Sequence, residues 1–344
     1  MPMTEIMVTG HEGFIGSLLV KLLIEEGYVV TGLDTNFFNS DCELFHEENK
    51  IKIINKDIRQ ISEADLQGID AVCHLAALSN DPLGKLNPEL TGDINFKASV
   101  RLAEMCKKVG VSKFIYSSSC SLYGKAGDDA LTEEAVFNPI TAYAKSKVMT
   151  EEHVLPMGDE KFCVTALRNS TAYGISSKLR LDLVVNNLVG WALVTGEIKI
   201  LSDGTPWRPI VHAEDIARAF IAVIKAPRER VNQQAFNVGI DSENYKIKEI
   251  AEAVAEMVPH CDIVITGEHG SDSRSYRVDF GKIKNRLPEF KPAWNLRKGI
   301  HQVHENYLRY KMNDEKFNGR YFTRLKQIRY LLNAGKISNE LFWR

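Results

Sequence analysis

The sequence lacks the features that mark several common functional classes. Its six cysteines are widely spaced and form no C-x-x-C pair, so we expect neither a zinc nor a redox site, and no metal. It has no apolar run long enough to span a bilayer, and its first residues do not pair a charged segment with an apolar one. We therefore expect a cytoplasmic protein without a membrane partner.

An excess of charge of either sign is also absent, because the 344 residues have a formal net charge of −2. Binding to nucleic acid usually needs a concentrated positive patch. Basic residues gather only over residues 309–329, where the aromatic and aliphatic residues between them fit packing positions, so we interpret this region as a solvated helical face. No nucleic-acid partner is expected, and the length fits one large domain or two closely joined domains.

The first half of the chain alternates short apolar runs with longer helical patterns, which is typical of a parallel sheet covered by helices. The expected strands are 6–9, 29–33, 51–55, 71–75, 113–117 and 162–167. The expected helices are 15–26, 90–109 and 143–154. This order predicts an α/β fold with a doubly wound, right-handed parallel sheet.

The alternation breaks after residue 168. We expect, in order, a helix at 183–195, a strand at 197–201, a strand and a helix within 210–225, a strand at 235–238 and a helix at 247–257. These elements predict a smaller α/β substrate-binding lobe made of residues 169–209 and 241–344. The first domain then comprises residues 1–168 and about 210–240, and no Pro-, Gly- or Ser-rich linker separates the two.

A glycine-rich loop follows the first expected strand and opens the first expected helix. Gly10, Gly13 and Gly16 permit a tight turn and let the backbone approach a pyrophosphate, while the helix N-terminus, with Phe14 and Ile15, attracts negative charge. Their spacing differs from the commoner G-x-G-x-x-G. The position of the loop predicts a Rossmann-type dinucleotide-binding domain.

Asp34 ends the second expected strand, about twenty residues after the loop, where a carboxylate can accept hydrogen bonds from ribose hydroxyls. An acid there repels a 2′-phosphate, so NAD is favoured over NADP; the alternative is a turn-forming Asp in residues 34–36. Asp57 and Ile58 follow the third strand and are candidates for the adenine edge. The small residues around Leu75, Ala76 and Ala77 would let the cofactor lie across the carboxyl edge of the sheet.

Tyr143 and Lys147 are four residues apart on the helix after the fifth strand. At this spacing an ammonium can lie beside a phenol and favour its ionised form, which makes a base from a weak acid. The pair alone recurs by chance on many solvated helices. Its setting is more informative, because the fifth strand ends in the hydroxyl-rich segment 117–121, which is aimed at the same crevice.

Together these motifs closely resemble the extended short-chain dehydrogenase/reductase family, in particular its nucleotide-sugar epimerase and dehydratase branch. The resemblance covers nearly the whole length and includes Ser119 four residues before Tyr123 and the segment 208–215. It implies that Tyr143 is the general base and acid on a sugar hydroxyl and that Ser119 hydrogen-bonds the same oxygen. Lys147 would hold the nicotinamide ribose and lower the pKa of the tyrosine, helped by the charge of oxidised NAD.

The resemblance also implies binding residues. Asn95 matches a position that orders the active-site backbone, with a local cap as the alternative, and we count it with Ser117 among the cofactor-site residues. The implied substrate-site residues are Ser79, Ser119, Cys120, Ser121, Thr171, Asn187, Leu188, Arg208 and Arg274. Arg208 and Arg274 would bind the diphosphate, which suits the forked guanidinium; surface salt bridges are the alternative, and Arg277 could replace Arg274. Thr171 stands where relatives often carry an Asn.

The choice within the family depends on Ser121, since members that eliminate water usually carry an acid two residues after the catalytic Ser or Thr. This chain has a serine there instead of an acid, which disfavours a 4,6-dehydratase and a uronate decarboxylase. We expect an NAD-dependent epimerase that acts on a nucleotide-diphosphate sugar through a transient keto sugar. The alternative is a keto-sugar reductase, which in this branch often prefers the NADPH that Asp34 opposes; a non-catalytic dinucleotide-binding protein would not need Ser119, Tyr143 and Lys147 together.

Two further expectations come from the resemblance. Many relatives are homodimers that associate through two helices of each subunit, one of them the helix that carries the tyrosine, so we expect a homodimer. Residues 311–344 extend beyond the usual end of the family and show apolar residues at helical spacing. We expect this C-terminal helical extension to pack on the smaller lobe, with a lid over the site or an oligomer contact as alternatives.

Overall fold

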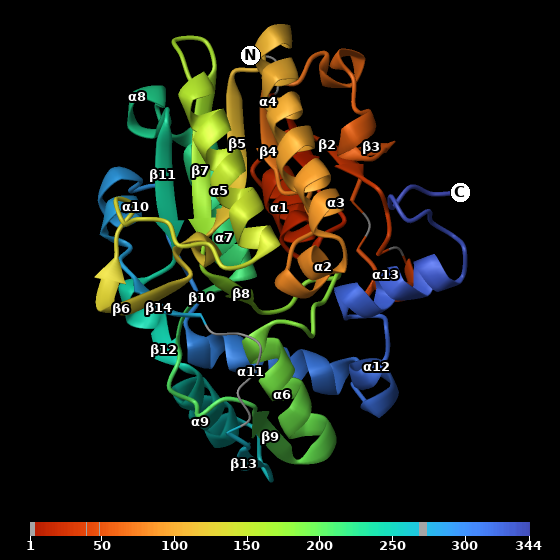
Figure 1. Ribbon diagram of the computed structural model, residues 1–344, viewed down its shortest axis with the longest axis vertical. Helices are drawn as coiled ribbons and strands as arrows, with labels where there is room; N and C mark the ends of the chain where they lie inside the picture. The colour runs from red at the N-terminus through yellow and green to blue at the C-terminus, as the bar shows by residue number, and fades with distance from the viewer. Residues whose placement is uncertain (1–3, 39, 48, 268–273) are drawn as a thin grey trace.

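The computed structural model describes residues 4–38, 40–47, 49–267 and 274–344. Its centre is a seven-stranded parallel sheet with the strand order β11-β7-β5-β4-β1-β2-β3 (Figure 1). The strands are β1 (Glu5–Thr9), β2 (Val29–Asp34), β3 (Lys52–Asn55), β4 (Ala71–His74), β5 (Lys113–Ser119), β7 (Cys163–Asn169) and β11 (Gln234–Val238). This is the Rossmann-type fold that the alternation of strands and helices predicts.

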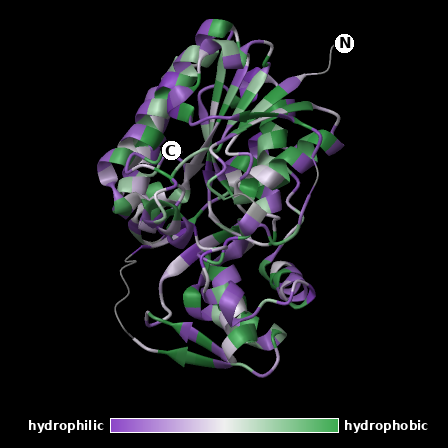
Figure 2. Cartoon of the chain, turned by 90° about the vertical axis from the view of Figure 1, so that its right-hand side faces the viewer, coloured by the Kyte–Doolittle hydropathy of each residue, from purple (hydrophilic) through white to green (hydrophobic). Residues whose placement is uncertain are grey.

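Helices cover both faces of the sheet, which explains why interior strands such as β1, β4 and β7 are almost entirely buried. On one face α1 (Phe14–Glu25) and α7 (Ala213–Lys225) share a buried core with Ile6 and Val8 of β1. On the other face α4 (Ala98–Val109) and α5 (Ala142–Val154) share a core with Met7. Successive side chains of β1 thus serve opposite layers. Figure 2 shows helices with hydrophobic and hydrophilic sides.

Strand order reverses at β1, because β2 and β4 pair with its two edges. Loops at the carboxyl ends of these strands diverge, and ligands of open α/β sheets bind in the crevice that this divergence leaves. The glycine-rich loop between β1 and α1 lies at this point.

The smaller lobe lies below the sheet in Figure 1. Its three-stranded sheet has the order β12-β10-β8, and a separate parallel pair joins β9 to β13. The strands are β8 (Thr171–Tyr173), β9 (Glu197–Ile200), β10 (Trp207–His212), β12 (Asn244–Lys246) and β13 (Asp262–Ile265). They share one buried core with α6 (Val184–Thr195), α9 (Ile247–Met257) and α11 (Leu296–Arg309).

Several elements were not expected from the sequence. A parallel pair joins β6 (Lys125–Leu131) to β14 (Ser275–Val278). The expected helix over 90–109 is divided into α3 (Pro88–Gly92), a π-helical turn at Asp93–Lys97 and α4. The remaining helices are α2 (Asp81–Leu86), α8 (Arg228–Val231), α10 (Gly281–Arg286), α12 (Asp314–Asn318) and α13 (Arg324–Asn333).

The C-terminal extension packs only in part where the sequence predicts. Phe317 and Phe322 join the core of the smaller lobe. Ile328, Leu331 and residues after α13 instead join the core that the sheet shares with α4 and α5. Helix α13 lies beside α2 (Figure 1). The expectation that the extension packs on the lobe is therefore wrong for its second half, because these apolar side chains are buried against the sheet domain.

Among the described residues, no helix combines the length and apolar character needed to cross a membrane.

Candidate active site

A cavity of about 900 Å³ runs along the carboxyl edge of the sheet and opens towards the smaller lobe. The glycine-rich loop, the ends of β2, β4 and β5, the first turn of α5, and residues of the lobe and of α13 line it. The sequence-predicted residues that line it on the dinucleotide side are Gly10, Gly13, Phe14, Ile15, Gly16, Asp34, Asp57, Ile58, Leu75, Ala76, Ala77, Ser117, Tyr143 and Lys147.

The glycine-rich loop closes so tightly that side chains are excluded. Gly10 has φ +76°, and a Cβ there would lie 2.8 Å from the backbone nitrogen of Ala76. A Cβ on Gly16 would overlap the carbonyl oxygen of Gly10. The close approach brings the N-terminus of α1 to the cavity, where its unpaired N–H groups favour an anion. These residues therefore fit a dinucleotide pyrophosphate.

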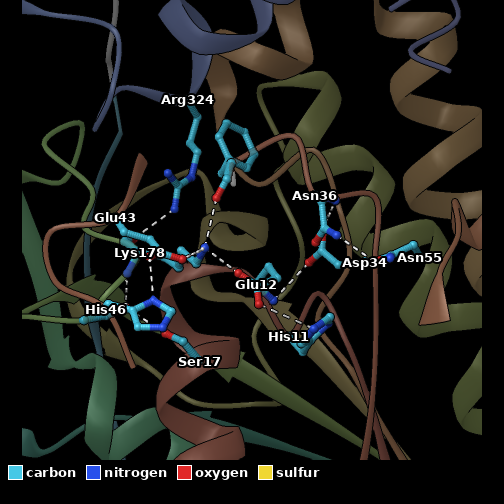
Figure 3. Close-up of polar contacts among 12 residues, drawn as sticks. His11, Glu12, Ser17, Asp34, Asn36, Glu43, His46, Asn55, Lys178 and Arg324 are labelled. Carbon is cyan, nitrogen blue, oxygen red and sulfur yellow. Dashed lines mark hydrogen bonds and ion pairs between the residues drawn. The ribbon is translucent and has the colours of Figure 1, made fainter. Parts of the chain in front are cut away.

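Asp34 ends β2 at the wall of the cavity (Figure 3). Its Oδ2 accepts a hydrogen bond from the backbone N–H of Glu12 at 3.1 Å, and Oδ1 accepts one from that of Asn36 at 3.1 Å. Burial raises the pKa of the carboxyl group, and His11 acts against this rise. The contact with Asn36 is the one expected of a turn-forming Asp, while the position on the cavity wall also suits a ribose.

Asp57 and Ile58 line the same end of the cavity, but the carboxylate of Asp57 is already engaged. Arg59 donates from Nε to Oδ1 at 2.9 Å and from Nη2 to Oδ2 at 2.7 Å. A contact of Asp57 with an adenine edge stays a prediction.

Tyr143 lies in the first turn of α5, which Thr141 caps by accepting a hydrogen bond from the N–H of Ala144 at 3.1 Å. Ser119 at the end of β5 lines the cavity together with Tyr143 and acts to lower the pKa of the phenol. Burial, together with the charge of Asp81, raises the pKa of Tyr143 to about 12, although Ser119 acts in the opposite direction. The strand end and the helix start thus bring together the two hydroxyls that the sequence paired.

Lys147 lies one turn further along α5 and is 4% exposed. Its Nζ donates to the carbonyl oxygen of Ser117 at 2.6 Å and lies 5.6 Å from the ring centroid of Tyr143. Burial lowers the pKa of Lys147 to about 7. The protein's own groups therefore do not give the lowered tyrosine pKa that the spacing predicts, because burial dominates.

Asn95 does not line the cavity but orders its wall. Its Oδ1 accepts from the N–H of Leu78 at 2.8 Å, and its Nδ2 donates to the carbonyl oxygen of Leu78 and to Oγ of Ser146, both at 3.2 Å. These bonds tie the segment after β4 to the helix that carries Tyr143 and Lys147. This geometry suits the positioning role implied for Asn95.

Two of the predicted substrate-site side chains do not reach the cavity. The predicted residues that line it are Ser79, Ser119, Ser121, Thr171, Asn187, Arg208 and Arg274. The side chain of Cys120 is fully buried in the core with Sγ against the carbonyl oxygen of Arg168, and that of Leu188 is packed in the core of the lobe. Both neighbour a lining residue in sequence, but their side chains point the other way.

The cavity wall contains two arginine–aspartate pairs, of which the sequence predicted only Arg274 as a site residue. Arg180 donates from Nε and Nη2 to the two carboxylate oxygens of Asp182 at 2.9 and 3.0 Å. Arg274 lies 2.9 Å from Oδ2 of Asp81, and Thr141 donates to the other oxygen at 2.5 Å. No motif marks Arg180, Asp182 or Asp81, and the pairing of Asp81 with Arg274 joins segments that are distant in the sequence.

Sequence reasoning also missed Asn169, which ends β7, lines the cavity and donates to Oγ of Ser117 at 3.0 Å. Counting back from Tyr173 placed the amide position at Thr171. The signal that could have found Asn169 is its place at the carboxyl end of a buried strand beside β5. Arg277, the predicted substitute for Arg274, is not among the residues that line the cavity.

The chain matches known proteins over most of its length. The model of the NAD dependent epimerase/dehydratase family matches residues 6–239. A UDP-glucose 4-epimerase of Mycolicibacterium smegmatis is 31% identical over 264 residues, which cover 73% of this chain and 82% of that protein.

Two solved structures share the fold. The UDP-N-acetylglucosamine 4-epimerase from Methanobrevibacter ruminantium M1, in complex with UDP-N-acetylmuramic acid, has a TM-score of 0.79 and 25% identity and covers 90% of this chain and 99% of that one. MoeE5, in complex with UDP-glucuronic acid and NAD, has a TM-score of 0.77 and 28% identity, with 89% and 99% covered.

Proposed function

The chain belongs to the NAD-dependent epimerase/dehydratase family, and from this premise we propose that it epimerises a nucleotide-diphosphate sugar at a carbinol carbon. The observation that carries the proposal is that Ser119, Tyr143 and Lys147 line one cavity at the point where the sheet domain and the lobe meet. The relatives are NAD-dependent enzymes of the short-chain dehydrogenase/reductase type, and so is this protein.

In the proposed mechanism Tyr143 removes the proton of a sugar hydroxyl and later returns it, while Ser119 holds the same oxygen. When bound, NAD supplies the hydride acceptor and donor. Because burial raises the pKa of Tyr143, the phenolate needs added positive charge, which protonated Lys147 and oxidised NAD would supply together. Asn95 and Thr141 position the cavity wall and the helix start.

The distribution of acids supports epimerisation over elimination. Ser121 lines the cavity where members that eliminate water carry an acid, and a hydroxyl does not replace a carboxylate as a base at neutral pH. Asp81 also lies near Tyr143, but Thr141 and Arg274 engage both of its oxygens. Both oxygens of this carboxylate are therefore occupied by partners from the protein itself.

On the lobe side, Arg208 and Arg274 suit a diphosphate. Both line the cavity, Arg208 is buried, and Nη1 of Arg208 donates to the carbonyl oxygens of Trp207 and Arg274. These bonds hold the two arginines together at one wall, where a guanidinium can bind two phosphate oxygens at once. Since the named relatives act on UDP-sugars, we propose a UDP-sugar as the substrate. Association of two copies through α5 stays a prediction, which light scattering tests.

The test of the proposed function is turnover without added cofactor. The purified protein is offered UDP-glucose, UDP-glucuronic acid and UDP-N-acetylglucosamine, and the products are separated by chromatography. An epimerase forms an isomer with its own retained NAD. A UDP-4-keto sugar is offered in parallel with NADH or NADPH. If it is reduced stoichiometrically while the three UDP-sugars give no isomer, the protein is a keto-sugar reductase and the proposal is contradicted.

Replacing Tyr143 by phenylalanine removes the acid–base hydroxyl and little else. We expect turnover to fall by about 10²-fold or more, since general acid–base catalysis contributes roughly 10² to 10⁴. The content of bound NAD, measured after heat release, should stay at the wild-type level. Tyr28→Phe is the matched control. Tyr28 precedes the first residue of β2, at the amino end of the strand and away from the cavity, so this change should leave turnover unchanged. Undiminished turnover in Tyr143→Phe would contradict the mechanism.

A further inference from the structure

The C-terminal segment 323–344 lies against the two loops that flank the adenosine end of the cavity. Trp343 donates from Nε1 to the carbonyl oxygen of Thr35 at 2.5 Å, just after β2 and Asp34. Gln327 of α13 donates to the carbonyl oxygen of Phe37 at 3.0 Å. Arg59, which holds Asp57, has its guanidinium 3.9 Å from the ring centroid of Phe342. The segment therefore covers these loops, and we call residues 323–344 the C-terminal strap.

Arg324, the first residue of α13, reaches from this strap into the cavity wall (Figure 3). It is 3% exposed, and its guanidinium lies 4.2 Å from the ring centroid of Phe38. Nη2 donates to the carbonyl oxygen of Lys178 at 2.9 Å. Nη1 is buried and has no hydrogen-bond partner among the residues that the structure describes.

A buried guanidinium with an unused donor is costly unless an anion joins it. Burial, together with the charge of Arg180, lowers the pKa of Arg324 to about 10. The charges of Asp182 and Asp34 act to raise this pKa. Among the described residues, neither acid forms a hydrogen bond with Nη1 of Arg324. The environment therefore favours a further negative charge near Nη1.

Lys178 connects Arg324 to the glycine-rich loop. Its Nζ pairs with Glu12 of that loop, with Glu43 at 2.8 Å, and donates to the carbonyl oxygen of Phe38 at 3.1 Å (Figure 3). Lys178 is 3% exposed, and the carboxylates of Glu12 and Glu43 balance its positive charge. Arg324, in contrast, keeps a donor available on the same side of the cavity as the N-terminus of α1.

We propose that Arg324 binds a phosphate group of the bound dinucleotide, so that the C-terminal strap is a part of the cofactor site. The cavity also admits a second diphosphate, that of the nucleotide sugar. The contacts of the strap with Thr35, Phe37 and Arg59 place it at the adenosine end and favour the dinucleotide. This inference rests on the NAD dependence of the family and not on epimerisation, so a failure of either proposal leaves the other standing.

The test measures binding without turnover. Bound dinucleotide is removed with charcoal, and the affinities of NAD, ADP-ribose, adenosine and UDP are measured by calorimetry for the wild type and Arg324→Gln. We expect the affinities of NAD and ADP-ribose to fall at least about tenfold, while those of adenosine and UDP stay within about twofold. Arg329→Gln, an exposed arginine on the same helix, is the control of equal charge and should bind all four ligands as the wild type does.

The pattern of losses decides between roles. An equal loss of adenosine and ADP-ribose binding would show that Arg324 only supports the fold, and a loss confined to UDP would assign it to the other diphosphate; either result, or unchanged binding, overturns the proposal. If Arg324→Gln does not fold, hydrogen exchange of the wild type decides. ADP-ribose but not adenosine should slow exchange of residues 324–333, and equal protection by both would overturn the proposal.

Discussion

Replacing Glu151 by glutamine should strongly destabilise the protein, because it leaves a buried guanidinium without its counter-ion. Glu151 of α5 and Arg168 of β7 have side chains that are 2% and 5% exposed. Nε of Arg168 donates to Oε1 of Glu151 at 2.9 Å, and Ser118 of β5 donates to Oε2 at 2.7 Å. The pair thus joins the Tyr143 helix to the two strands behind it.

The expected loss follows from what remains after the change. Arg168 keeps its bonds from Nη1 to Tyr123 and to the carbonyl oxygen of Glu133, but its charge stays out of water. Removing one partner of a buried pair typically costs about 3 to 5 kcal/mol. The measurement is urea unfolding followed by circular dichroism at one fixed concentration of NAD, because ligand binding itself adds stability.

Glu152 is the matched control, since it is the next residue on the helix and is exposed. Glu152→Gln should change the free energy of unfolding by less than about 0.5 kcal/mol. The double variant Glu151→Leu with Arg168→Met removes both charges and should recover a large part of the loss. A loss in Glu151→Gln of less than about 1 kcal/mol would refute the reasoning that burial makes this pair expensive to break.

Two further predictions concern single acids. Asp34→Ser removes the charge that repels a 2′-phosphate, so the ratio of NADP to NAD affinity measured by calorimetry should rise by roughly tenfold; an unchanged ratio would contradict the role of Asp34. Burial raises the pKa of Asp215 to about 6, so the folded state binds more protons than the unfolded state, whose pKa is about 3.9. Stability relative to Asp215→Asn should therefore fall by about 2 kcal/mol as the pH rises from about 4 to about 6 in denaturant titrations, and a flat or rising difference would contradict this sign.

The fold was largely predictable because each central strand is buried on both faces. Such strands are short apolar runs, and the helices between them keep a different period, so the two patterns separate clearly. The strand β6 (Lys125–Leu131) has no such run and pairs with residues about 150 positions later. Its pairing depends on tertiary contacts, which local patterns do not contain.

The candidate site was predictable where local geometry restricts the residue type. Gly10 and Gly16 occupy positions that exclude a Cβ, and Tyr143 with Lys147 follows a helical spacing. Arg180 with Asp182 and Asp81 with Arg274 are different, because any surface salt bridge has the same composition. Only the three-dimensional structure shows that these pairs line the cavity beside Tyr143.

The C-terminal extension shows the same limit and its consequence for function. Its spacing of apolar residues predicts buried helices, but the spacing is equally compatible with the lobe, the sheet domain or a second copy. The partner is selected by single contacts such as that of Trp343 with Thr35, which a periodic pattern does not encode. Since these contacts lie at the loops after β2 and β3, a segment that resembles an appendage in the sequence lines the cavity, and the Arg324→Gln measurement tests whether it also binds the cofactor.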